Sequence, residues 1–285
     1  MTDLPTRSFA LPDLRIVPVP SLVPHERHDE HRTGPLTARL RAQGVLRNPP
    51  VVAPFPSAPE ERYIVLDGAN RTAAARQSGL PFLAVQAVRY EEPDVRLLTW
   101  NHALAGESAR TLADLFTSIP GVIVERESLS HARALLARRE ALAFVSMPGG
   151  EVITLACSGD FAERNRALNR IVETYRGRSR VYRVAPDSLE SAQERIPDAE
   201  ALVVFPRFAP AEILELAATG EQLPAGITRH LVAWRALRVN LPLEFLAETE
   251  QSREEKQAWL NAWMRERVER SQVRFYEEST VLFDE

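Results

Sequence analysis

The sequence predicts an α+β protein built from two domains. Short apolar segments rich in β-branched residues, such as 49–55 and 62–66, alternate with longer segments whose apolar residues recur at helical spacing. A second series of strand-like and helix-like segments follows Pro120 and indicates a second α/β or α+β layer. A length of 285 residues suits one large or two modest domains. We expect the domains at 1–92 and 93–285.

The first domain is expected to combine four strands with two helices. Residues 1–13 are rich in proline and without periodicity, so they are expected to form a loose lead-in. Gly44 and Gly79 stand where the two helices should end, because glycine readily adopts the left-handed conformation of a helix C-terminus. The expected strands are 15–23, 49–55, 62–66 and 82–90, and the expected helices are 25–44 and 69–78.

The second domain is expected to open with a helical stretch at 93–118. A long polar loop, 219–230, and a charged helix, 250–270, are expected near its end. Between them the pattern predicts helices at 128–139, 160–175, 187–195 and 210–218 and strands at 141–146, 151–157, 180–184 and 201–205.

Composition excludes several classes of function. A net charge of −4 argues against nonspecific nucleic-acid binding as the main role, although a local basic face stays possible. No apolar run approaches the roughly 18–20 residues of a membrane span, and no basic-then-apolar signal segment is visible, so a cytoplasmic location is expected. Cys157 is the only cysteine, which excludes an internal disulfide and a multi-cysteine zinc site. Lys256, near the C-terminus, is the only lysine, which argues against a P-loop and a lysine Schiff base.

The segment 63–78, YIVLDGANRTAAARQS, is the clearest functional signal. It is typical of a strand, a tight turn and a helix. Exposed N–H groups and the positive end of the helix dipole at such a helix start attract anions. Arg71 in the first helical turn could add bidentate contacts. We therefore expect a phosphate group at Asp67–Arg71, while an ordinary strand–turn–helix is the alternative. The expected contacts are Gly68, Ala69, Asn70, Arg71 and Thr72.

The first domain resembles the ParB/sulfiredoxin superfamily. The resemblance rests on GVLRNPPVV at 44–52 and on VLDGANR at 65–71. Sulfiredoxin-like members place a catalytic cysteine between the glycine and the arginine, where this chain has Ala69 and Asn70. Chromosome-partitioning ParB proteins carry a Gly-Glu-Arg-Arg motif followed by a helix-turn-helix, and this chain shows neither pattern clearly.

Within that superfamily the chain is most similar to the free-serine kinase group, which includes the siderophore-pathway enzymes that form O-phosphoserine. PHE at 24–26 resembles the segment that carries the catalytic glutamate of this group. LPAGITRH at 223–230 and RVNLPLEFL at 238–246 resemble its late motif. The group usually has histidines where this chain has Ala69 and Asn70.

The resemblance implies phosphoryl transfer from ATP or ADP to a small hydroxyl amino acid, with free L-serine as the expected acceptor. Glu26 would be the general base, and Asp67 would share the proton transfer or bind Mg²⁺. From the residues alone, Glu26 could be a solvated acid at a helix start, Asp67 a helix cap, and Arg71 an ion-pair partner of either. The resemblance assigns the substrate to Thr228, Arg229 and His230 in the loop 226–230, with Trp100 bordering the pocket.

Two other functions stay open. One is a ParB-like nucleotide- or DNA-binding transcriptional regulator without kinase activity, which a basic face beside the first domain would favour. The other is an effector sensor that kept the fold without catalysis. The kinase hypothesis places the active cleft between the two domains.

Overall fold

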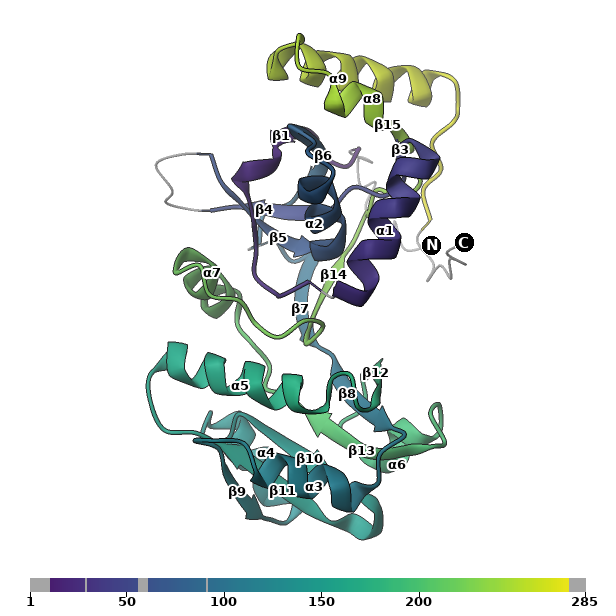
Figure 1. Ribbon diagram of the computed structural model, residues 1–285. Helices are drawn as coiled ribbons and strands as arrows, with labels where there is room; N and C mark the ends of the chain where they lie inside the picture. The colour runs from purple at the N-terminus through teal and green to yellow at the C-terminus, as the bar shows by residue number, and fades with distance from the viewer. Residues whose placement is uncertain (1–10, 29, 56–60, 91, 277–285) are drawn as a thin grey trace, which may run out of the picture. The chain divides into compact units, whose positions relative to one another are not determined.

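The structure, a computed structural model, describes residues 11–28, 30–55, 61–90 and 92–276 (Figure 1). These residues form two compact units. The first contains the described residues of Met1–Leu22, Glu30–Glu92 and Val232–Glu285, and the second contains Val23–Asp29 and Pro93–Leu231. The chain passes from the first unit to the second between Glu92 and Pro93, close to the expected boundary. It returns to the first unit at Val232, so the residues 93–285 are divided between the two units.

The first unit is organised around a five-stranded sheet of order β1-β6-β4-β5-β2. β1 pairs antiparallel with β6, which is parallel to β4, and β4 is antiparallel to β5. Two helices, α1 (Glu30–Gln43) and α2 (Ala69–Gln77), pack against each other in this unit (Figure 1). The strands are β1 (Leu14–Pro18), β2 (Leu22–Pro24), β4 (Val51–Pro54), β5 (Tyr63–Asp67) and β6 (Phe82–Ala87). The predicted α+β class is confirmed.

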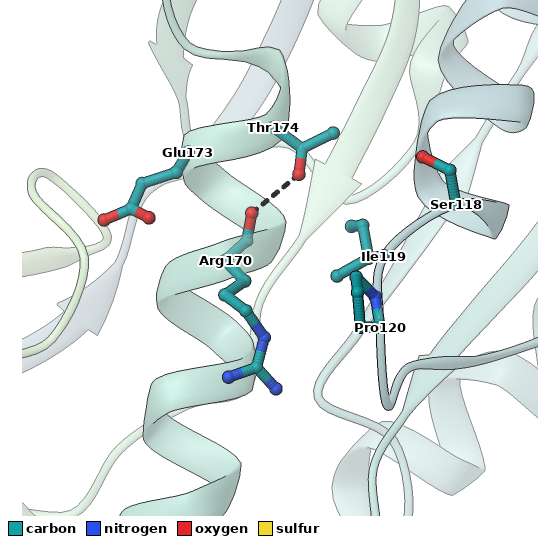
Figure 2. A pocket seen from close by; sticks show the side chains of 6 residues that line it. All are labelled: Ser118, Ile119, Pro120, Arg170, Glu173 and Thr174. Carbon is teal, nitrogen blue, oxygen red and sulfur yellow. Dashed lines mark hydrogen bonds between the residues drawn. The ribbon is translucent and has the colours of Figure 1, made fainter.

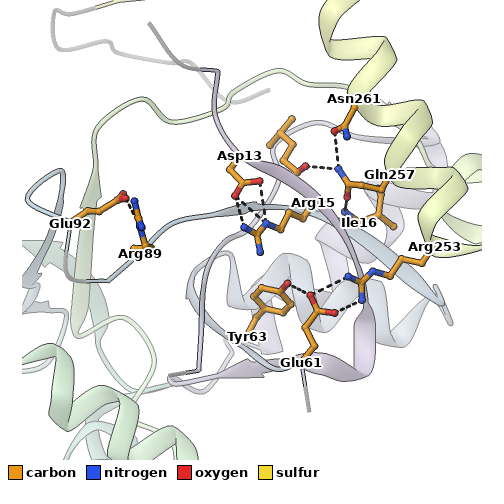
Figure 3. A network of polar contacts seen from close by, with 11 residues as sticks. Asp13, Arg15, Ile16, Glu61, Tyr63, Arg89, Glu92, Arg253, Gln257 and Asn261 are labelled. Carbon is orange, nitrogen blue, oxygen red and sulfur yellow. Dashed lines mark hydrogen bonds and ion pairs between the residues drawn. The ribbon is translucent and has the colours of Figure 1, made fainter. Parts of the chain in front are cut away.

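The C-terminal segment belongs to the first unit for identifiable reasons. β15 (Leu241–Pro242) pairs antiparallel with β3 (Val45–Leu46), and α8 (Leu243–Ala247) follows directly. On α9 (Arg253–Glu269), Gln257 accepts a hydrogen bond from the Ile16 amide at 2.7 Å and donates to the Leu14 carbonyl at 3.0 Å. Arg253 pairs with Glu61 (Figure 3). The Gln257 hydrogen bonds tie α9 to the edge strand β1, and the Arg253 ion pair ties it to the residues before β5. Sequence periodicity could not indicate these contacts.

Lys256 lies inside this C-terminal packing. Its side chain is fully buried, donates to the Phe245 carbonyl and pairs with Glu248 at 3.2 Å. The ammonium group lies 4.7 Å from the centroid of the Phe245 ring. A charged group at zero exposure is tolerated because a carbonyl, a carboxylate and an aromatic face satisfy it together.

The second unit is built on a six-stranded sheet of order β12-β8-β13-β10-β11-β9, in which every neighbouring pair is antiparallel. A separate two-stranded ladder joins β7 (Val95–Thr99) to β14 (Thr228–Val232). The strands of the large sheet are β8 (Asn101–Ala105), β9 (Ile123–Arg126), β10 (Ala143–Ser146), β11 (Val152–Ala156), β12 (Arg180–Val184) and β13 (Ala199–Val204).

Five helices complete the second unit. Ser108 and Ser128 accept hydrogen bonds from backbone N–H groups of the first turn of the helices they precede, and Asp160 forms a reciprocal capping box with Glu163. These caps explain why the helix starts follow polar residues in the sequence. The helices are α3 (Ala109–Thr117), α4 (Leu129–Ala137), α5 (Phe161–Tyr175), α6 (Leu189–Gln193) and α7 (Pro210–Ala218).

Two expectations about this unit are wrong. The stretch 93–118, expected to be helical, forms β7 and β8 before α3 begins at Ala109. Its apolar run VRLLTWNHALA does not separate a buried strand from a buried helix by periodicity, and β8 is buried between two neighbours of the sheet. The expected loop 219–230 ends in β14, which starts at Thr228. Within the described residues, no helix is long and apolar enough to cross a membrane.

Candidate active site

The predicted strand–turn–helix of the phosphate motif is present in the first unit. β5 ends at Asp67 and α2 begins at Ala69, with Gly68 between them at φ 99°. This left-handed conformation favours glycine. A side chain there would also be crowded, because a Cβ atom on Gly68 would lie 3.0 Å from the Pro50 side chain and 2.9 Å from that of Arg71. The turn therefore brings the backbone and Arg71 close together at the helix start.

Asp67 is held between two arginines. Its carboxylate pairs with Arg71 at 2.5 Å and also with Arg235. Burial alone would raise the pKa of Asp67, but the charges of Arg71 and Arg235 outweigh it and lower the pKa to about 2. The side chain is 41% exposed, so solvent weakens the energetic effect of these pairs. The pair with Arg71 is the ion-pair alternative that the sequence left open.

The sequence did not indicate that Arg235 is a partner of Asp67. Arg235 lies 168 residues from Asp67, in a segment with no motif of its own, so nothing local pointed to it. Among the other predicted contacts, Asn70 accepts a hydrogen bond from the Thr33 hydroxyl at 3.4 Å. The Thr72 side chain is 1% exposed and therefore lies inside the unit, whereas Ala69 is half-buried at the helix start.

Glu26 lies in the second unit, where it meets the late motif. The backbone of Glu26 forms a parallel bridge with Leu223, so the two motifs lie side by side although they are about 200 residues apart. The Glu26 carboxylate accepts three hydrogen bonds from this motif. Gly226 N–H donates to Oε2 at 2.9 Å, while the N–H and the hydroxyl of Thr228 donate to Oε1 at 2.6 and 2.5 Å.

The other predicted substrate residues lie in the same unit as Glu26. His25 Nε2 lies 2.8 Å from the Thr228 hydroxyl, and the rings of His25 and His230 meet edge to face at 5.2 Å between centroids. The Arg229 guanidinium lies over the Trp100 ring, 4.2 Å from its centroid. The structure thus brings Glu26, Thr228 and His230 together around His25, and it places Arg229 against Trp100 in the same unit.

A buried polar pair behind this loop was also missed. His102, on β8, lies 2.7 Å from the Tyr175 hydroxyl and 3.1 Å from the Gly226 carbonyl. Burial is the main influence that lowers the pKa of His102 to about 3; the Gly226 carbonyl opposes the shift, and Arg183 and Arg176 add to it. Burial raises the pKa of the Tyr175 hydroxyl well above its usual range, and both side chains are therefore neutral near pH 7.

The predicted residues form two clusters, one in each unit. Asp67, Gly68 and Arg71 belong to the first unit, and the residues around Glu26 belong to the second. The expected cleft between domains and the individual roles of these residues stay predictions.

The residues around Asp67, as they are placed, do not form a Mg²⁺ site by themselves. Asp67 Oδ2 is engaged by two arginines, and among the described residues no group of three His, Cys, Asp or Glu side chains could hold a metal ion. Magnesium is commonly held by one or two carboxylates together with substrate phosphates, so the expectation of Mg²⁺ stays a prediction.

A pocket of about 330 Å³ lies elsewhere in the second unit, between α5 and the turn that follows α3. Figure 2 shows the residues that line it, including Arg170 and Glu173 on the helix and Ile119 and Pro120 on the turn. None of the predicted site residues lines this pocket. Its size alone gives no reason to place the chemistry there.

Known proteins similar to this chain were found by sequence and by structure. No protein-family model matches the chain. It is 24% identical over 238 residues to the ATP-dependent L-serine kinase SbnI of Staphylococcus aureus, covering 82% of this chain and 84% of the relative. It is 24% identical over 246 residues to the ADP-dependent L-serine kinase SerK of Thermococcus kodakarensis, covering 86% and 96%.

Two further comparisons differ in extent. An ATP-dependent L-serine kinase of Staphylothermus marinus is 30% identical over 100 residues, which are 35% of this chain and 39% of the relative. A solved structure described as a free serine kinase in complex with AMP superimposes with a TM-score of 0.71 at 18% identity, covering 85% of this chain and 98% of the other. At that identity the structural likeness shows the fold.

These relatives bear out the predicted class of activity, a nucleotide-dependent kinase of free L-serine, because that is the activity their names print. They name both ATP and ADP as donors. The ParB/sulfiredoxin-like label of the first domain is not addressed by them.

Proposed function

We propose that this protein is a phosphotransferase that moves a phosphoryl group from ATP or ADP to free L-serine and forms O-phosphoserine. The observation that carries the proposal is the meeting of the PHE motif with the LPAGITRH motif at the Glu26 carboxylate. The similarity to L-serine kinases over more than four fifths of the chain supports the same activity. The motif order of the first unit further supports a ParB/sulfiredoxin-like fold for it.

Glu26 is the proposed base. A carboxylate has about four acceptor positions, and three are filled by the N–H groups of Gly226 and Thr228 and by the Thr228 hydroxyl. Oε2 accepts one of these three bonds and retains a position for a serine hydroxyl. As the serine oxygen attacks the terminal phosphorus, its proton passes to Glu26, the bond from phosphorus to the nucleotide oxygen breaks, and the shortened nucleotide leaves.

The donor phosphates are assigned to the start of α2. The N–H groups there, the Arg71 guanidinium and Arg235 would supply positive charge for phosphate oxygens. Phosphate oxygens would compete with Asp67 for these arginines, because the carboxylate and a phosphate offer similar acceptors. When bound, Mg²⁺ would neutralise phosphate charge.

The amino acid is assigned to the second cluster. A guanidinium binds a carboxylate through two parallel hydrogen bonds, and Arg229 is fixed over the Trp100 ring, where it could receive the serine carboxylate. The His230 ring contacts the ring of His25, which in turn contacts the Thr228 hydroxyl beside Glu26. The proposal therefore makes activity depend on residues of both units.

The test is direct detection of product. The protein is incubated with L-serine and either ATP or ADP, each with Mg²⁺, and O-phosphoserine is measured by mass spectrometry. Glu26→Gln should lower turnover by about 10²–10⁴-fold and leave nucleotide affinity unchanged, whereas Glu190→Gln, on the exposed face of α6, should behave as the unaltered protein.

No product with either donor would overturn the kinase proposal and would favour the regulator alternative, which salt-dependent binding to duplex DNA would then test. Product formation with full activity in Glu26→Gln would keep the kinase and remove Glu26 as its base.

A further inference from the structure

The segment 226–228 is shaped to present its donors to Glu26. Gly226 has φ 79°, which favours glycine, and a Cβ atom there would lie 2.2 Å from the Arg183 side chain. Arg176 donates to the Ala225 carbonyl at 3.1 Å, just before the turn. The conformation of this turn decides where the N–H groups of Gly226 and Thr228 point.

On one side of Glu26 the hydrogen-bond directions can be assigned. The Thr228 hydroxyl has a single proton, which it donates to the Glu26 carboxylate, an acceptor only. His25 Nε2, 2.8 Å from the same hydroxyl oxygen, must then be the donor. His25 is 3% exposed, so its N–H is directed at Thr228 within the unit and not at solvent.

The directions of the hydrogen bonds made by His102, on the Gly226 side of Glu26, can be assigned in the same way. The Gly226 carbonyl can only accept, so His102 Nε2 carries the proton and donates to it. In the neutral ring Nδ1 is then an acceptor, and the Tyr175 hydroxyl donates to it. Hydrogen bonds thus run from Tyr175 through His102 to the Gly226 carbonyl, and the N–H of the same residue, which belongs to the preceding peptide group, donates to Glu26 Oε2.

This buried pair is polar at positions where apolar residues of similar volume could also pack. His102 and Tyr175 are 1% and 0% exposed, among apolar residues of the second unit. Buried polar groups are unfavourable unless fully paired, and apolar residues of similar volume often serve a core equally well. The side chains around them that carry charge or titrate are Arg176 and Arg183 at the loop and His25 and His230 near Glu26. A role in orienting the loop accounts for the polar pair.

We propose that His102 and His25 are positioning residues for Glu26, His102 acting through the backbone conformation of Gly226 and His25 through the Thr228 hydroxyl. The inference rests on the proposed function, in which Glu26 is the base. Each histidine fixes the donor that reaches one carboxylate oxygen, so that the remaining acceptor position of Oε2 faces the serine hydroxyl. A change in the backbone dihedral angles of Gly226 would turn its N–H away from Oε2 and leave the carboxylate held by Thr228 alone.

The experiment compares two substitutions at one position in the full-length chain. His102→Leu removes the donor to Gly226, while His102→Gln retains an amide N–H near the position of Nε2. We expect His102→Leu to lower kcat at least tenfold with nucleotide Kd unchanged within twofold, and His102→Gln to recover most of that loss. His131→Leu, on the exposed face of α4, is the matched control and should leave kcat unchanged.

A second measurement does not depend on catalysis. The ¹H and ¹⁵N shifts of the Gly226 amide should follow the ionisation of Glu26 in the unaltered protein and in His102→Gln, and this response should be lost in His102→Leu. If His102→Leu does not fold, the pair Thr228→Val and Thr228→Ser tests the His25 side, with Ser expected to restore the kcat that Val loses.

Unchanged kcat and an unchanged Gly226 response in His102→Leu would overturn the inference while the kinase activity stands. If the unaltered protein makes no O-phosphoserine, the proposed function is refuted. Loss of the Gly226 response in His102→Leu would in that case still support the hydrogen bonds described here.

Discussion

The buried His102 should make the second unit sensitive to acid. In the unfolded chain this imidazole takes up a proton near pH 6.5, but burial lowers its pKa to about 3 in the folded protein. The unfolded chain therefore binds the extra proton between these two values. The contribution of neutral His102 to stability is fully present above pH 6.5 and is lost progressively as the pH falls from 6.5 to about 3.

The magnitude follows from the two pKa values. Between pH 7.5 and pH 4.5 the linkage lowers the free energy of unfolding by about 2–3 kcal/mol. His102→Gln cannot titrate, so this part of the pH dependence should be missing from the variant. Other histidines contribute equally to both proteins, and the difference between the two pH dependences therefore isolates His102.

The assay is native-state hydrogen exchange of the β8 amides at both pH values, corrected for intrinsic exchange rates and read by mass spectrometry. The free energy of opening β8, obtained from the exchange rates, should fall by about 2–3 kcal/mol more in the unaltered protein than in His102→Gln when the pH is lowered from 7.5 to 4.5. The same pH dependence in both proteins would refute the reasoning, because it would mean that His102 is protonated in the folded state or is not withdrawn from water.

Three further outcomes are expected. Arg71→Ala should weaken nucleotide binding by about 1.5–3 kcal/mol, measured by calorimetry, while Arg62→Ala, at an exposed residue just before β5, should not; equal affinities would remove Arg71 from the phosphate site. His230→Ala should raise the KM for serine or lower turnover with nucleotide affinity unchanged, and a change in nucleotide affinity alone would contradict its role. Lys256→Met should change the free energy of unfolding by less than about 1 kcal/mol, because Glu248 is partly exposed and becomes hydrated; a thermal melt showing a larger loss would mean that the ion pair stabilises α9.

The local parts of the fold were accessible from the sequence. The β5–turn–α2 segment was predicted within a residue or two, because an apolar strand, a glycine and a helix-forming run each express their preference locally. The caps at Ser108 and Asp160 belong to the same class of signal. The error at 93–105 has the opposite cause, since β7 and β8 are set by partners that lie far along the chain.

The candidate site divides in the same way. Resemblance to a kinase motif was needed to bring Glu26 and Thr228 together, because no pattern of periodicity joins residues about 200 positions apart. Arg235 and His102 carried no signal, since each acquires its partner only through the tertiary fold. Long-range pairing of this kind depends on backbone geometry that a single sequence does not reveal.

The placement of Lys256 has a consequence for the chemistry of the whole chain. Among 35 lysine and arginine residues it provides the only side-chain amine, and it lies on α9 with no exposed surface. Acylating reagents, and enzymes that attach groups to lysine, can reach this nitrogen only when α9 opens. The rate of Lys256 modification would therefore report the rate at which α9 opens, and no other lysine in the sequence would compete for the reagent.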